Sequence, residues 1–466
     1  MIENIISGVN DALYSYVLII LLVLGGIYFT VRTRFAQFRL LGQQFKAVTE
    51  KTDKNGVSSF QALMVSTASR VGTGNIIGVA TALCVGGFGS VFWMWLIAII
   101  GAASAFVEST LAQIYKKRGA DGCYGGPAYY IEAATKRKWL AILFSVFLIL
   151  TYGFGFNMLA SYNLQATFSS YRFYDPTYTP WIIGFVVAVL VGYCLIGGGK
   201  RIVTVTSFLV PIMGGLYILV ALGITIANAK LLPDVFRQIF AGAFDMKAIF
   251  GGFGGSCVMY GIKRGLFSNE AGVGSAPNAS ASADVSHPAK QGLVQVLSVF
   301  IDTILVCTAT AFLCMTSGVT PPTSSAQAAS YVQNALSATL GSVGPVFITV
   351  AMILFAFTTL LGNLFYVDKT INYLLGKEPG KGLRNVCYVI ASAVIFVGAG
   401  LSADLLWGIA DITMGGMTLI NMPVILYLGK YAFRTLKDYE KQLKAGGNIT
   451  FRKKDIGLPH ETDYWN

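Results

Sequence analysis

A short glycine-rich stretch, Val71-Gly72-Thr73-Gly74-Asn75, lies in the middle of an apolar segment, residues 60–85, that is long enough to cross a membrane. A bilayer core holds no water to satisfy freed backbone groups, so a spanning helix is broken there only where it faces protein or a wet cavity. Free N–H groups at Gly72, Thr73 and Gly74 would stand at the start of a half-helix, which favours an anion. Glycine also lets a ligand approach the backbone closely.

Backbone carbonyls freed on the other side of this break, near Ala68 and Val71, suit a hard cation such as sodium, because hard cations prefer oxygen ligands. Asn75 offers both a donor and an acceptor, so it is a candidate partner for either a cation or an organic solute. The pattern predicts a buried site where an anionic or zwitterionic molecule lies beside a cation. The alternative is that the glycines only allow close helix packing.

A second glycine-rich interruption lies between residues 245 and 280. It runs from Gly251-Gly252-Phe253-Gly254-Gly255 through Gly265-Leu266-Phe267-Ser268-Asn269-Glu270. Carbonyls freed near Gly265 are predicted to accept hydrogen bonds from an ammonium group. Phe267 and Phe154 are predicted to close over the side chain of a bound molecule, with helix packing as the competing role for these aromatic residues.

The composition is that of a polytopic membrane protein, since 55% of the 466 residues are hydrophobic and only 12% are charged. The net charge of +12 does not indicate a nucleic-acid partner, because the basic residues lie in short loops between apolar runs. The seven cysteines form no C-x-x-C pair, and both histidines, His287 and His460, lie outside the apolar runs. We therefore expect no disulfide framework, no cofactor, no metal beyond a cation such as sodium, and no catalytic centre.

Hydropathy, taken at about 20 residues per span, predicts an all-α fold with about eleven transmembrane helices. The predicted spans are roughly 12–31, 58–85, 88–115, 139–168, 180–198, 202–228, 245–280, 290–316, 344–367, 383–400 and 403–430. The stretch 322–342 is too polar to span and is predicted as a short helix in an external loop. The tail after Lys437 is predicted as a surface helix followed by loose chain.

Basic residues are divided very unequally between the two alternating sets of loops. Of the 34 Lys and Arg residues, 27 fall in one set and four in the other. Positively charged loops stay in the cytoplasm. We therefore expect a multi-pass protein of the plasma membrane, surrounded by lipid, with its N-terminus outside and its C-terminus in the cytoplasm.

When the first span is set aside, ten spans remain, and they divide into two sets of five that each open with a glycine-interrupted span. An odd number of spans per unit places the two copies in opposite orientations, and interrupted segments in corresponding positions indicate a transport site. The predicted organisation is an extra helix and loop at 1–57, five-helix repeats at 58–230 and 231–430, and a cytoplasmic tail at 431–466.

Several strings carry a resemblance to a known family. They are Val71-Gly72-Thr73-Gly74-Asn75-Ile76-Ile77-Gly78-Val79-Ala80, Phe92-Trp93-Met94-Trp95, Gly265-Leu266-Phe267-Ser268-Asn269-Glu270-Ala271-Gly272-Val273-Gly274-Ser275-Ala276 and Phe355-Ala356-Phe357-Thr358-Thr359-Leu360-Leu361-Gly362. On these, nearly the whole chain resembles the alanine or glycine:cation symporter family of sodium-coupled amino-acid carriers. The resemblance implies the leucine-transporter fold, a 5+5 inverted repeat, and import of a small neutral amino acid with sodium by alternating access.

The resemblance also implies that the hydroxyls of Thr358 and Thr359 complete the sodium site, although back-bonding to the helix is their common alternative role. Two positions depart from the family pattern: Asn363 stands where a Trp is usual, and Ala160 where a Gln is usual. Both are expected to line the pocket, so a larger or more polar neutral side chain is a second possibility for the substrate.

These inferences give two predicted sets of site residues. The substrate set is Gly72, Thr73, Gly74, Asn75, Phe154, Ala160, Gly265, Phe267, Ser268 and Asn363. The sodium set is Ala68, Val71, Thr358 and Thr359. The implied partners are an amino acid, sodium and membrane lipid, and an oligomer is not required.

Arg70 precedes the first break, and an ionisable residue in a span is functional by default. We expect it to pair with Glu270, Asp302 or Asp411. Proton coupling remains an alternative to sodium coupling. A channel, which needs a ring of charges or carbonyls usually drawn from several subunits, is the second alternative.

Overall fold

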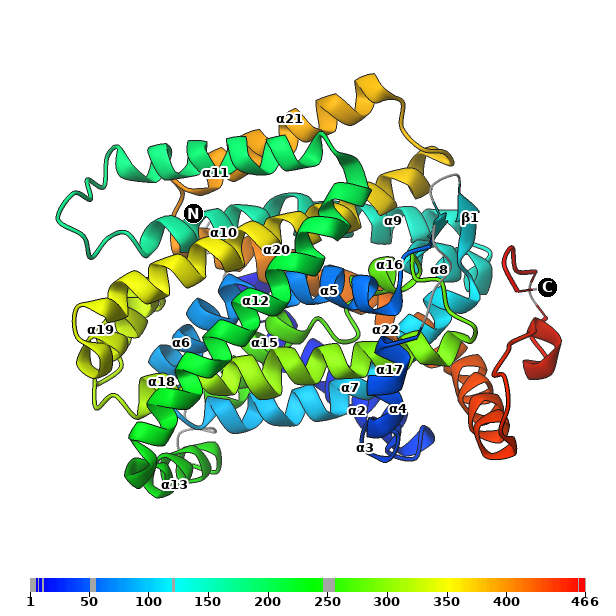
Figure 1. The fold of residues 1–466 in the computed structure, drawn as a ribbon, viewed down its shortest axis with the longest axis horizontal. Coiled ribbons are helices and arrows are strands. Elements are labelled where there is room, and N and C mark those ends of the chain that lie inside the picture. Colours follow the sequence, from blue (N-terminus) through cyan, green and yellow to red (C-terminus); the bar gives the residue numbers. More distant parts are fainter. Residues whose placement is uncertain are drawn as a thin grey trace.

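Helices make up most of the computed structural model, which describes residues 6, 8–10, 12–50, 56–119, 122–245, 256–459 and 461–465 (Figure 1). Strands among these residues are β1 (Lys117–Gly119) and β2 (Gly122–Tyr124), which pair antiparallel. The helices up to the middle of the chain are α2 (Leu18–Arg32), α3 (Ala36–Arg39), α4 (Leu41–Val48), α5 (Ser59–Arg70), α6 (Val79–Thr81), α7 (Ser90–Ile114), α8 (Pro127–Thr135), α9 (Lys138–Leu148), α10 (Phe156–Ala166), α11 (Thr179–Leu195), α12 (Gly198–Ala227) and α13 (Leu232–Ala243).

The remaining helices belong to the second half of the chain. They are α15 (Cys257–Asn269), α16 (Pro277–Ser280), α17 (Pro288–Val299), α18 (Thr308–Met315), α19 (Ala328–Leu340), α20 (Val343–Leu375), α21 (Lys381–Gly398) and α22 (Ala403–Ala445). Several helices continue through π-helical turns, at Leu13–Val17, Gly74–Gly78, Ala82–Gly86, Ile149–Gly155 and Phe300–Cys307. Short 3₁₀ turns lie at Ala229–Leu231, Ser325–Gln327 and Lys453–Ile456.

The first predicted break is confirmed. Helix α5 begins with a capping box, in which Ser58 and Gln61 satisfy each other's backbone amides. It ends at Arg70, because Val71 leaves the helical region with ψ near 84°. The chain resumes a helical path at Gly74–Gly86 after a bend of 50°.

The chain is an all-α polytopic membrane protein. Among the described residues, seven helices are long and apolar enough to span a membrane, or eight when the bent pair is counted as one span. Helices α12 and α21 turn large apolar side chains such as Phe208, Leu219 and Val389 outward, which suits contact with lipid tails.

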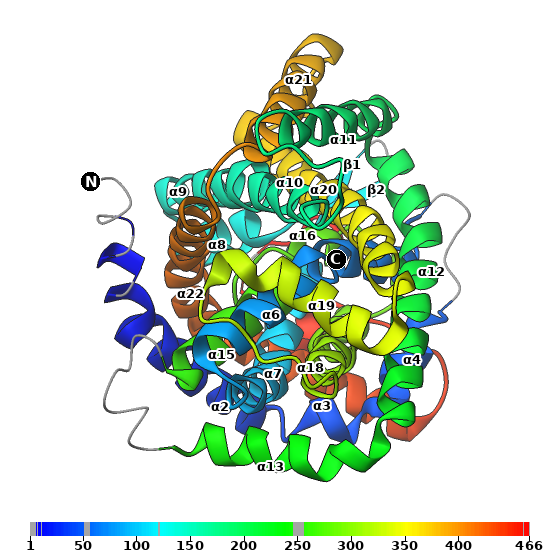
Figure 2. The ribbon, with the colours of Figure 1, turned by 90° about the vertical axis from the view of Figure 1, so that its left-hand side faces the viewer.

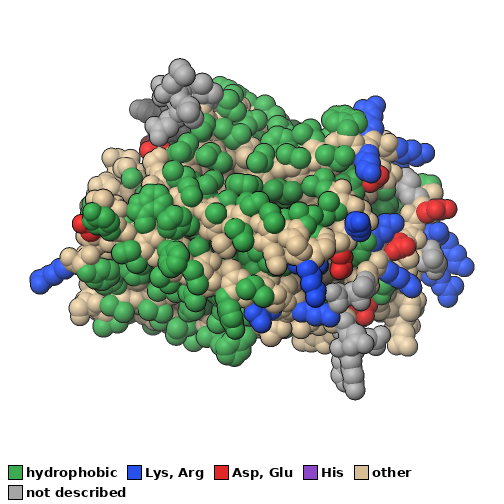
Figure 3. All heavy atoms as spheres, turned by 90° about the horizontal axis from the view of Figure 1, so that it is seen from above, with side chains coloured by type: hydrophobic (Ala, Val, Ile, Leu, Met, Phe, Trp, Pro, Cys, Tyr) green, Lys and Arg blue, Asp and Glu red, His purple; other side chains and the backbone are tan. Residues whose placement is uncertain are grey.

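Charged side chains gather at one end of the long axis of the molecule (Figure 3). This basic end holds β1, β2, α8 and the segment after α22, whereas α13 and α19 lie at the opposite end (Figure 1). The short helix predicted within 322–342 is confirmed as α19.

The broken helices lie inside the bundle. In the view along the long axis, α6 and α15 are surrounded by α2, α22, α20 and α12 (Figure 2). Every described side chain of α15 except Tyr260 is buried, and α5 is buried along most of its length. Backbone freed at these breaks is therefore shielded from lipid, as a break at membrane depth requires.

The polar tail is packed rather than loose. Trp465 donates from its indole N–H to the carbonyl of Gln113 at 2.7 Å, and the Tyr464 hydroxyl lies 2.8 Å from the Asp284 carboxylate. The ammonium group of Lys116 lies 3.8 Å from the centre of the Tyr464 ring. These contacts bind the end of the chain to the basic end of α7, so the prediction of loose chain there is wrong.

Candidate functional site

The first break is held by Asn75. Its amide oxygen accepts the backbone N–H of Gly72 at 2.8 Å, and its own backbone N–H donates to the Gly72 carbonyl at 3.1 Å. The prediction that the Gly72 amide is free for an anion is therefore wrong in this conformation. Opening of the break for a ligand at Gly72 would require Asn75 to release it.

The hydroxyl of Thr359 faces the break from α20. A Cβ built at Gly72 would overlap this hydroxyl, so only glycine allows the close approach of the two elements. Thr359 is 6% exposed, and its Oγ1 has no hydrogen-bond partner among the described residues. A buried hydroxyl without a partner is costly, and a bound cation or water would satisfy it. Ala68 and Val71, whose carbonyls are the other predicted cation ligands, are also buried.

Thr358 points to a different neighbour. Its hydroxyl donates to the Leu354 carbonyl at 2.9 Å and lies 3.2 Å from the sulfur of Met213 on α12. The back-bonding alternative therefore describes Thr358, and only Thr359 of the predicted pair faces Gly72.

An aromatic layer covers the break. A Cβ at Gly74 would lie 2.6 Å from the Phe267 ring, which places that ring directly over Gly74. The ring centre of Phe267 lies 4.3 Å from that of Phe156 and 4.8 Å from that of Trp407. The guanidinium of Arg264 lies 3.8 Å from the centre of the Trp407 ring, which is the geometry of a cation–π contact. Sequence reasoning missed both Phe156 and Trp407.

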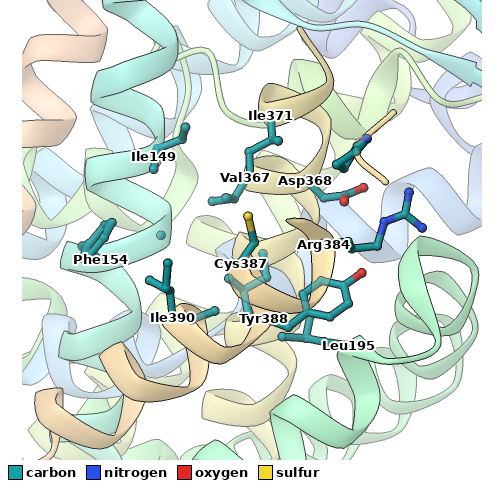
Figure 4. A pocket seen from close by; sticks show the side chains of 14 residues that line it. Ile149, Phe154, Leu195, Val367, Asp368, Ile371, Arg384, Cys387, Tyr388 and Ile390 are labelled. Atoms are coloured by element: carbon teal, nitrogen blue, oxygen red, sulfur yellow. The ribbon is translucent and has the colours of Figure 1, made fainter. Parts of the chain in front are cut away.

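Phe154 lies elsewhere. It lines an apolar cavity of about 250 Å³ with Ile149, Val367 and Ile390 (Figure 4). The ring that packs on Phe267 from this segment is Phe156, two residues later. The geometry therefore gives no support to the prediction that Phe154 and Phe267 together close over the side chain of a bound molecule.

The second break lies later than predicted. Gly265 is inside α15, and a Cβ there would lie 2.5 Å from a methyl carbon of Ile97 on α7, so Gly265 serves close helix packing. The prediction of a break at Gly265 is wrong, because the chain leaves the helix only at Glu270, whose φ is +53°. Gly272 and Gly274 continue with φ of +85° and +91°. The predicted glycine run 251–255 lies outside the described residues.

Glu270 connects the two breaks. Its carboxylate accepts from Ser69 at 2.9 Å and from Ser275 at 2.6 Å. The Ser69 hydroxyl also lies 2.7 Å from the side-chain oxygen of Asn363, which donates through its amide nitrogen to Asn157 at 2.9 Å. This chain of polar groups ties α15, α5, α20 and α10 together beside the site.

Helix α10 reaches the first break through Asn163, whose amide donates to the Thr73 hydroxyl at 3.2 Å. Ala160 is buried one turn earlier. Residues three apart share a helix face, so Ala160 lies on the side of α10 that faces Thr73. Ser268 also meets the break, because its hydroxyl lies 3.2 Å from the Asn75 amide nitrogen.

Arg70 makes no ion pair with the acids expected for it. Its Nη1 donates to the Gln295 side chain at 2.8 Å, and its Nε and Nη2 have no hydrogen-bond partner among the described residues. Asp411 is bound instead by Lys263 at 2.9 Å and Arg264 at 3.1 Å. The predicted pairing is therefore wrong.

Two cavities approach the site from opposite ends. A polar cavity of about 330 Å³ is lined by Lys263, Arg264 and Asp411, together with Trp407 of the aromatic layer. A larger one of about 810 Å³ opens at the basic end, where Gly119 and Gly122 of the β-hairpin line it. The region of the breaks lies between the two cavities along the chain, since α5 leads from Gln61, which lines the larger one, to Arg70, and α15 carries Lys263 and Arg264, which line the smaller one.

Comparisons with known proteins identify the family of the chain. Residues 1–453 match the model of the sodium:alanine symporter family. The chain is 41% identical to the amino-acid carrier protein AlsT of Bacillus subtilis (strain 168), covering 99% of this chain and 97% of AlsT. It is 41% identical to the probable sodium/glutamine symporter GlnT of the same organism, covering 100% of this chain and 96% of GlnT.

A third relative is the sodium/proton-dependent alanine carrier protein of Bacillus sp. (strain PS3). It is 37% identical over 89% of this chain and 95% of its own length. These relatives are named as carriers or symporters, not as enzymes. With the family model matched over 453 residues and a helix broken at buried glycines, the chain belongs to the sodium:alanine symporter family.

Proposed function

We propose that this protein imports a small neutral amino acid of the alanine or glycine class together with sodium. The observation that carries the proposal is the buried hydroxyl of Thr359, which faces the broken helix at Gly72 and has no partner in the described part of the chain. Hard cations prefer oxygen ligands. A sodium ion held by Thr359 and the carbonyls of Ala68 and Val71 would satisfy that hydroxyl and stabilise the break.

The amino acid would lie on the other side of the same break. Its carboxylate would face the start of the half-helix at Thr73 and Gly74, where backbone N–H groups favour an anion. Its side chain would face Phe267, which covers Gly74. Because the Phe267 ring lies so close to Gly74, little room is left there for a large side chain. This supports a small substrate.

The architecture that we propose is eleven transmembrane helices, built as an N-terminal helix and two inverted five-helix repeats. Helices α2 and α11 are apolar but short, and with α15 they coincide with three of the predicted spans. The repeat is supported by α8 and α19. Each follows the second span of its repeat, and they lie at opposite ends of the bundle (Figure 1).

The basic end would face the cytoplasm. The C-terminal segment would then lie inside the cell, and the start of the first helix would lie outside. Alternating access would then open the polar cavity to the outside and the larger cavity to the cytoplasm. Opening the outer path requires the stack of Trp407, Phe267 and Phe156 to part.

Uptake by purified protein in proteoliposomes, competed with each of the twenty amino acids, tests the proposed function. We expect uptake of labelled alanine that an inward sodium gradient drives and that glycine and unlabelled alanine inhibit. A proton gradient that drives full uptake without sodium would favour the alternative of proton coupling alone. Solute flux that neither gradient concentrates would favour a channel.

Asn363→Trp tests selectivity. Asn363 lies one turn after Thr359, on the face of α20 that contacts the first break. A ring there should narrow the pocket, so we expect any competition by serine, asparagine or glutamine to fall about tenfold while glycine still competes. The same competition assay measures it, with glycine as the internal control. An unchanged profile in a variant that still transports would show that Asn363 does not face the substrate.

A further inference from the structure

A buried carboxylate lies directly behind the first break. Asp302 is fully buried in the π-helical turn that links α17 to α18. One oxygen accepts from the Asn75 amide at 2.7 Å. The other accepts from the hydroxyls of Ser268 at 2.5 Å and Thr303 at 2.7 Å. The group therefore joins the first break, the end of α15 and the span that begins at α17.

This carboxylate has no ion-pair partner within 4.0 Å among the described residues. The charged group that acts on it from α5 is Arg70, through space, while the guanidinium itself binds Gln295. On its own element the titratable neighbour is the Cys307 thiol, 3.1 Å from the Ser268 hydroxyl. A carboxylate at membrane depth with no cation in direct contact is costly to keep ionised.

The donors around Asp302 stabilise its ionised form but do not make a metal site. Asn75 turns its NH₂ group toward the carboxylate and uses its oxygen on the Gly72 amide. Ser268 and Thr303 likewise donate to it. A sodium site needs several oxygens turned toward one point, and this arrangement turns N–H and O–H groups there. A proton would remove the buried charge, and the hydroxyl of Ser268 or Thr303 could then rotate to accept from the carboxylic acid.

We infer that Asp302 is a protonation site that couples proton binding to the sodium and substrate site. The carboxylate takes a proton from water on one side of the membrane and returns it to water on the other. When it is protonated, the charge-assisted bond from Asn75 weakens. Asn75 holds the Gly72 amide with its other end, so protonation also loosens the break. This inference rests on the proposed function, because it names a second ion for the same cycle.

The test uses proteoliposomes that enclose a pH-sensitive dye. In wild type we expect alanine, added with an inward sodium gradient, to change the internal pH and an imposed pH gradient to change the uptake rate several-fold. Asp302→Asn keeps the shape but cannot ionise, so it should carry alanine with less than about a twofold response to the pH gradient and no dye signal. Glu108→Gln, a buried acid bonded to Gly272 and Asn421, is the matched control and should keep the signal.

Several results would overturn the inference. One is sodium-driven uptake in wild type with no proton movement, and another is a proton signal that survives in Asp302→Asn. Both leave the proposed function intact, whereas wild type without sodium-driven uptake refutes the proposed function itself.

If Asp302→Asn is inactive or unstable, Thr303→Val tests whether Asp302 is the protonation site. It removes one donor to the ionised form, so the pH profile of uptake should shift toward higher pH by about half a unit to one unit. An unshifted profile contradicts the inference.

Discussion

Gly72→Ala is expected to lower sodium-driven alanine uptake at least about 100-fold, which corresponds to roughly 3 kcal/mol, while the protein still inserts and purifies as a single species. The added methyl group would occupy the position of the Thr359 hydroxyl. Either Thr359 moves away or the break widens, and in both cases the proposed sodium site is lost. Initial uptake rates per amount of protein measure the effect.

Gly214→Ala is the matched control, because a Cβ at Gly214 on α12 would meet nothing within 4 Å. It should transport at nearly the wild-type rate. Transport by Gly72→Ala at a similar rate would mean that the glycine only serves packing and that ligand binding lies elsewhere.

Thr359→Val and Thr358→Val are expected to behave differently, although the residues are adjacent and the substitutions identical. Thr359→Val removes the unpartnered hydroxyl that faces Gly72, so the sodium concentration for half-maximal uptake should rise about tenfold or more, roughly 1.4 kcal/mol. Thr358→Val removes a hydroxyl that is back-bonded to Leu354 and faces α12, so it should change sodium dependence little.

Sodium titrations of alanine uptake measure both variants, with protein abundance determined in parallel. Equal effects of the two substitutions would contradict the division that the structure makes between them. An unchanged sodium dependence in Thr359→Val would remove Thr359 from the ion site.

The first break could be predicted from sequence because two glycines beside an asparagine, inside an apolar span, combine poor helix formers with a polar side chain that lipid does not tolerate. Gly265 could not be assigned in the same way. A glycine in a spanning helix either frees the backbone or lets another helix approach, and only the position of Ile97 on α7 shows that Gly265 does the second.

Helix periodicity failed where the helices depart from 3.6 residues per turn. Phe154 lies in a π-helical turn, Ile149–Gly155, and Phe156 follows it. Such a turn changes which side chains face the bundle interior, so the sequence alone does not tell which of the two rings meets Phe267. Adjacent threonines point about 100° apart on a helix, and the sequence does not tell which of Thr358 and Thr359 faces α5.

Ion pairs were equally hard to predict, since they depend on which helices meet. By charge alone, Asp411 is a reasonable partner for Arg70. In the structure, however, α22 packs against α15, and Asp411 pairs with Lys263 and Arg264. A functional role for Asp302 could be predicted from sequence, because it is an acidic residue inside a span. Its link to Asn75 required the arrangement of three elements in space.

Alanine-dependent uptake of radioactive sodium shows whether sodium and alanine move together through the break. Proteoliposomes with equal sodium on both sides receive an inward alanine gradient, and labelled sodium entry is followed beside labelled alanine entry. We predict that alanine drives sodium inward in wild type and in Gly214→Ala, and that Gly72→Ala and Thr359→Val lose or weaken both fluxes together. Alanine entry that moves no sodium in wild type, or equal sodium entry with and without alanine, would show that the two solutes are not coupled.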